Sequence, residues 1–114
     1  MTLVSQVEKK SDWIIDSRCS HHMTGDMNKF VDFKSCDGGT IRVGNNATCY
    51  IKGIGSITLD GKSKTEDVYF VDGLKHNLLS VGQLVVKCYQ LQFTEKTCMI
   101  KDKGGRVISA ETKS

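Results

Sequence analysis

The sequence contains no proline, few aromatic residues (7%) and no apolar run of the length that spans a membrane. Without proline, the turns must be formed by glycine, asparagine and aspartate, and eleven glycines are available for them. A transmembrane helix needs about 20 consecutive apolar residues. We therefore expect no membrane partner.

Blocks of like charge are also missing. The chain carries 16 lysines and arginines against 13 acidic residues, a net charge of +3, and the basic residues are spread along it. Nucleic-acid-binding domains usually concentrate their basic residues on one face. The aromatic residues on expected strands are predicted to be core residues, namely Tyr50, Tyr69, Phe70 and Tyr89. The sequence thus does not support nucleic acid as a partner of this domain.

The five cysteines have irregular spacing and include no CxxC pair, so they predict no disulfide framework. The first residues lack the apolar stretch and cleavage site of a secretory signal. We expect a cytoplasmic, reducing location with free thiols. The polar ends suit a piece of a longer polypeptide.

The length of 114 residues suits one domain with a single modest core. We expect a flexible N-terminal extension over residues 1–12, a β-domain over 13–109 and a flexible tail over 110–114. The apolar run 13–15 predicts a buried strand that leads into a polar loop at Asp16. Other strands are expected at 66–71, 89–93, 98–101 and 107–109.

A β-hairpin is predicted over residues 40–59, because apolar residues alternate on both sides of the turn signal at 44–46. Gly53 and Gly55 interrupt its second arm, which indicates a bulge or a close approach by another backbone.

One helix is predicted after residue 76. Asn77 is suited to be its N-cap, and Lys87 lies in its last turn. Apolar residues with a spacing of three to four predict its buried side, namely Leu78, Leu79, Val81, Leu84 and Val85.

Asp16 and Ser17 follow the apolar strand, at the edge of the expected core. An Asp in this position is most often a turn residue, but a carboxylate at a dry core edge also suits acid catalysis. That chemistry requires two carboxylates that share a proton around one water. With one candidate Asp, the second must come from a symmetric copy of the chain.

Three spaced motifs occur in order along the chain. Residues 13–26 read W-I-I-D-S-R-C-S-H-H-M-T-G-D, V-G-N at 43–45 precedes I-K-G-I-G at 51–55, and residues 77–84 read N-L-L-S-V-G-Q-L. The first is similar to W-x-x-D-S-G-C-S-x-H-M-T-G-D, the active-site stretch of copia-type (Ty1/copia) retrotransposon Gag-Pol polyproteins. The others are similar to that family's hairpin and helix. From about Trp13 to Val107, the chain resembles their protease segment.

The resemblance implies an all-β fold, a retropepsin-like acid-protease β-barrel with one short α-helix. It implies a homodimeric aspartic endopeptidase without a cofactor, which cleaves its own polyprotein inside retrotransposon particles. Two copies of Asp16 would meet at the two-fold axis, and Ser17 would brace the loop. A flap at the hairpin tip would close over the peptide substrate, and it would comprise Gly44, Asn45, Asn46 and Ala47. The apolar-apolar-Gly element that supports the catalytic loop corresponds to Leu78-Leu79 or to Val81-Gly82.

Arg18 stands where the family motif has glycine. Its side chain would crowd the two-fold axis, and a guanidinium near Asp16 favours the carboxylate form and opposes the shared proton. Alternatively, Arg18 turns outward and pairs with a surface acid such as Asp37. Two hypotheses follow: a working endopeptidase, or a decayed copy that keeps the fold as a structural or dimerising module.

A zinc-binding module is a further alternative, because Cys19, His21 and His22 offer thiolate and imidazole ligands. Their spacing is poor for it, since Cys36 has no second ligand nearby. A Cys19–His22 cysteine-protease pair has no orienting group that can be named. We therefore expect no metal ligands in this chain.

Overall fold

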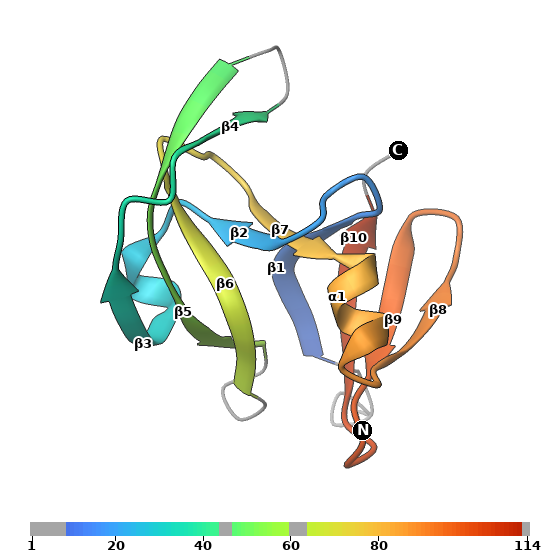
Figure 1. Ribbon diagram of the computed structural model, residues 1–114. Helices are drawn as coiled ribbons and strands as arrows, with labels where there is room; N and C mark the ends of the chain where they lie inside the picture. Colours follow the sequence, from blue (N-terminus) through green and yellow to red (C-terminus); the bar gives the residue numbers. More distant parts are fainter. Residues whose placement is uncertain (1–8, 44–46, 60–63, 113–114) are drawn as a thin grey trace, which may run out of the picture.

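The computed structural model describes residues 9–43, 47–59 and 64–112. These residues form one continuous ten-stranded sheet and one α-helix (Figure 1), which confirms the expected all-β fold. The elements are β1 (Lys9–Asp16), β2 (His22–Thr24), a 3-10 helix (Met27–Lys29), β3 (Phe30–Ser35), β4 (Thr40–Val43), β5 (Ala47–Thr58), β6 (Lys64–Asp72), β7 (Asn77–Ser80), α1 (Val81–Val86), β8 (Gln90–Phe93), β9 (Thr97–Lys101) and β10 (Val107–Thr112).

The sheet has the strand order β3-β5-β6-β2-β7-β1-β10-β9-β8, and β4 pairs with β5. In Figure 1, strands β3 to β6 lie on one side and β8 to β10 with α1 on the other. The central strands β1, β2 and β7 join the two sides. None of the helical segments described has the length and apolar content needed to span a membrane.

The central strands bury both of their faces. Ile15 of β1 and Leu79 of β7 belong to a large apolar cluster that also contains Leu84 of α1. Leu78 belongs to a second cluster, against which Ile14 packs. Continuous apolar runs are typical of strands that are buried on both faces, which explains the W-I-I and L-L runs.

The helix begins three residues later than expected. The N-cap is Ser80, whose Oγ accepts the Gln83 N–H at 3.3 Å, and the prediction of Asn77 for this role is wrong. Residues 77–80 instead form β7, because both neighbouring leucines have apolar partners on opposite faces of the strand. Val85, predicted for the buried side, is 58% exposed.

The predicted hairpin is confirmed. Strands β4 and β5 pair from Thr40 with Tyr50 to Val43 with Ala47. Of the expected flap, Gly44, Asn45 and Asn46 lie outside the described residues, and Ala47 is exposed.

Gly53 and Gly55 lie beside two register shifts in the pairing of β5 with β6, so the expected bulges are present. The expected close approach is present as well. A Cβ atom on Gly55 would lie 2.2 Å from the Asp32 carbonyl oxygen of β3.

The ends of the domain and strands β2 and β3 differ from the sequence-based expectation. β1 begins at Lys9 and β10 ends at Thr112, so paired strands extend into both segments that were expected to be flexible. Strands β2 and β3 were not expected, because β2 has only three residues and β3 alternates weakly, with four of six residues exposed.

We predict that Gly55→Ala lowers the free energy of unfolding by about 1–3 kcal/mol, because the new methyl group would overlap the β3 backbone. The matched control is Gly82→Ala in α1, where the nearest atom to a new Cβ would be 3.8 Å away. This control should be neutral or should stabilise the protein by up to about 1 kcal/mol, since alanine favours helix. Urea unfolding of both variants measures the difference, and equal stabilities would contradict the packing described.

Candidate functional site

Asp16 ends β1, between β7 on one side and β10 on the other. It is only 5% exposed. The chain then turns, with the Cys19 N–H donating to the Asp16 carbonyl oxygen at 3.2 Å. The Arg18 N–H donates to Asp16 Oδ1 at 2.9 Å, while the Ser17 and Arg18 side chains are exposed. The backbone thus holds a buried carboxylate at the start of an exposed turn.

The Arg18 guanidinium lies beside this carboxylate. Its Nε is 3.6 Å from Asp16 Oδ1, and the Arg18 side chain is 71% exposed. The alternative pairing of Arg18 with Asp37 is therefore wrong, and Asp37 instead accepts the Gly39 N–H. Because the arginine is exposed, solvent screens its attraction to the buried carboxylate and the pair contributes little stability. The positive charge of Arg18 nevertheless favours the ionised form of Asp16.

Strand β7 runs parallel to β1 and ends beside the Asp16 turn. Asp16 lies in register with Ser80, and Ile14 and Ile15 lie in register with Leu78 and Leu79. Of the two candidate supporting elements, Leu78-Leu79 is therefore the one that lies along β1, whereas Val81-Gly82 lies in α1. The Gln83 side chain of α1 also donates from Nε2 to the Ser20 carbonyl oxygen at 3.3 Å.

The H-M-T stretch forms β2, which bridges β7 at Met23 and Leu78. His22, 1% exposed, accepts the Ser80 N–H at Nδ1 over 3.0 Å. On the other side of the bridge, Thr24 donates to Asn77 Oδ1 at 2.6 Å. These two polar side chains therefore fasten β2 to β7.

Gly25 follows β2 and lies in a tight space. A Cβ atom there would lie 2.1 Å from the Leu74 carbonyl oxygen, so no larger residue fits without movement of the backbone. The sequence analysis did not predict this contact, because the neighbouring segment is 49 residues away in the chain.

The described residues contain no cluster of three or more His, Cys, Asp or Glu side chains that could hold a metal ion. The alternative zinc site at Cys19, His21 and His22 therefore does not form. The His22 Nδ1 accepts a backbone N–H, and the His21 ring stacks on Tyr69 with centroids 4.6 Å apart.

Tyr50, expected in the core, is 57% exposed on the hairpin, so that prediction is wrong. Lys52 Nζ lies 5.6 Å from the centroid of the Tyr50 ring. Position 50 falls on the outer face of β5, because the flanking residues Cys49 and Ile51 are the buried ones.

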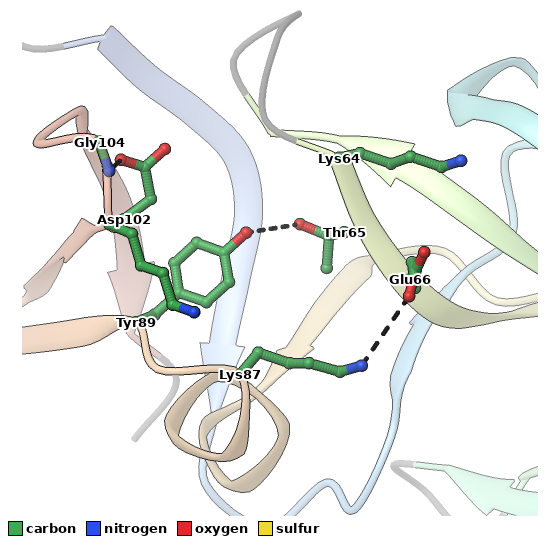
Figure 2. A pocket seen from close by; sticks show the side chains of 8 residues that line it. Lys64, Thr65, Glu66, Lys87, Tyr89, Asp102 and Gly104 are labelled. Carbon is green, nitrogen blue, oxygen red and sulfur yellow. Dashed lines mark hydrogen bonds and ion pairs between the residues drawn. The ribbon is translucent and has the colours of Figure 1, made fainter.

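A cavity of about 360 Å³ opens at the opposite end of α1 (Figure 2). Its charges are largely compensated: Lys87 lies 3.9 Å from Glu66, and Lys64 pairs with Asp32 outside the cavity. Thr65 and Tyr89 share a hydrogen bond across it at 3.3 Å. Asp16 does not line this cavity, since it lies beside Ser80 at the N-terminal end of the helix.

The family described as the Pol polyprotein β-barrel domain matches residues 13–89. The Retrovirus-related Pol polyprotein from transposon TNT 1-94 of Nicotiana tabacum is 31% identical over 104 residues, which cover 88% of this chain and 8% of that protein. The corresponding protein from transposon RE1 of Arabidopsis thaliana is 28% identical over 97 residues, 81% of this chain and 7% of that protein. No solved structure matches the chain.

The chain therefore spans less than a tenth of the length of either relative. The family match covers the second half of β1, strands β2 to β7 and α1, and it includes the Asp16 turn and strand β7 beside it. The protein belongs to the Pol polyprotein β-barrel domain family and is similar to the Pol polyproteins of copia-type transposons.

Proposed function

We propose that this domain is one half of a homodimeric aspartic endopeptidase that processes its Pol polyprotein, with Asp16 as the catalytic residue. The observation that carries the proposal is the buried Asp16 carboxylate, which a backbone N–H holds at the end of a strand paired on both sides. A carboxylate fixed in this way can share a proton without reorganising.

The second carboxylate has to come from another copy of the chain. Asp16 is the only buried acidic residue in the part of the chain that the structure describes. Two such groups about 3 Å apart cannot both ionise, so one acts as an acid and the other as a base toward a single water. The turn that bears Asp16 is exposed at Ser17 and Arg18, which leaves it open to a symmetric contact.

The substrate would be an extended segment of the polyprotein. In this proposal, the β4–β5 hairpin, whose second strand starts at the exposed Ala47, would cover the bound peptide and exclude water. Ser17 would brace the turn, and no cofactor takes part.

Arg18 opposes this chemistry, and its contact with Asp16 favours the second candidate function, an inactive structural or dimerising module. The positive charge stabilises Asp16 as a carboxylate, and in a dimer it would act from both copies. We therefore propose that the domain retains the catalytic framework and that Arg18 restrains its activity.

Replacing Arg18 should raise the activity. We expect Arg18→Gly to increase kcat/KM for peptide cleavage about tenfold or more, since about 1.4 kcal/mol of recovered transition-state stabilisation is a factor of ten. Arg18→Ala should have nearly the same effect. Among the described non-glycine residues only Asp67 and Cys88 have positive φ, so position 18 does not require the conformational freedom of glycine.

Cleavage can be measured by mass spectrometry on a degenerate peptide library, because the preferred sequence is not needed in advance. The control is Arg18→Gly combined with Asp16→Asn, which keeps the shape of the side chain and removes the acid. Activity that survives Asp16→Asn would refute the proposed catalytic role. No cleavage by either Arg18 variant would favour the structural module.

A further inference from the structure

We propose that His22 is a positioning residue for Asp16: its neutral imidazole fixes the Ser80 end of β7, and its protonation releases that end and sets the acid limit of catalysis. The effect on catalysis rests on the proposed function. The effect on the Ser80 backbone does not, and it can be measured separately.

Ser80 connects the three elements that surround the Asp16 turn. Its N–H donates to His22 Nδ1 of β2 at 3.0 Å, and its Oγ caps α1. Its Cα is the register partner of Asp16 in the parallel pairing of β1 with β7. A shift of the Ser80 backbone would therefore be transmitted directly to the turn that holds the carboxylate.

The contact between His22 and Ser80 requires a neutral imidazole. Because Nδ1 accepts the N–H, the ring proton of the neutral form is assigned to Nε2. A protonated ring carries a hydrogen on both nitrogens and has no acceptor left. The Ser80 N–H would then face another donor in a site where His22 is 1% exposed.

The surroundings keep His22 neutral over a wide pH range. Burial lowers the pKa of His22 from 6.5 to about 4. Asp67 of β6 acts in the opposite direction and raises the pKa, whereas His21 beside β2 and Lys87 at the end of α1 lower it further. His22 thus becomes charged in the folded protein only well below neutral pH.

Because the pKa of His22 is lower in the folded chain than in the unfolded chain, the free energy of unfolding depends on pH. Between about pH 6.5 and pH 4, the unfolded chain binds a proton at His22 that the folded chain does not. The stabilisation of the folded state by neutral, buried His22 is fully present above pH 6.5 and is lost as the pH falls toward 4. The urea midpoint should decline over this interval, and His22→Asn should remove much of the decline. His76→Asn, at an exposed histidine, is the matched control and should change little.

The structural part can be tested by hydrogen exchange of the Ser80 and Arg18 amides, followed by NMR in the full chain. In the wild type, protection of the Ser80 amide should fall at least tenfold between pH 7 and pH 4, after correction for the intrinsic exchange rate. His22→Asn keeps an acceptor near the place of Nδ1 and should stay protected, whereas His22→Leu should lose protection at pH 7. If His22→Leu does not fold, the wild-type titration decides. Unchanged Ser80 protection at pH 4 would overturn the proposal.

The catalytic part can be tested in the Arg18→Gly chain with the peptide library. The acid limb of kcat/KM should lie near pH 4, and His22→Asn should move it at least one pH unit lower while the activity at pH 6 changes less than threefold. An acid limb that stays in place would overturn the catalytic role of His22. Absence of all cleavage would count against the proposed protease function, and the exchange experiment would still test the positioning role.

Discussion

The parallel pairing of β1 with β7 is the constraint on which the rest of the structure depends. It brings residues 13–16 beside residues 77–80. Two apolar runs that are far apart in the sequence thereby bury one face in each of the two apolar clusters. Because the two strands end together, Asp16 lies beside the residue that caps α1. The turn with the carboxylate, the helix and the β2 side chains are all positioned by this one register.

The local sequence predicted those features that local chemistry decides. The apolar run before Asp16, the hairpin with its two close-packed glycines and the strands that end the chain all follow from alternation and turn residues. The position of Asp16 at the edge of the core followed from the same pattern. Its association with protein cleavage came from the resemblance of the spaced motifs, since a single Asp after a strand indicates only a turn.

Other features depended on contacts between distant segments. Leu78 and Leu79 have helical spacing with Val81 and Leu84, but pairing with β1 makes them a strand, and no local rule predicts that pairing. The sequence offered His22 only as a metal ligand or as the partner of Cys19, because its role as the acceptor of the Ser80 N–H depends on a segment 58 residues away. The direction of the Arg18 side chain was equally undetermined, because an exposed arginine can reach several acids.

The backbone and the side chain of Arg18 act on Asp16 in different ways. The Arg18 backbone N–H holds the Asp16 carboxylate, and this hydrogen bond does not involve the Arg18 side chain. Its side chain alone places a cation next to the group that has to share a proton in the proposed mechanism. In the proposed function, the domain therefore keeps its fold and its buried aspartate while one exposed side chain restrains the chemistry.

The central claim is that two copies of Asp16 form one site, and the most direct test is the solution mass of the purified chain. Light scattering would be recorded over a range of concentrations, at acidic and at neutral pH. We predict that the mass rises with concentration from 12.6 kDa toward twice that value. A mass that stays at 12.6 kDa under all these conditions would contradict the central claim, because the described residues of one chain include a single buried aspartate.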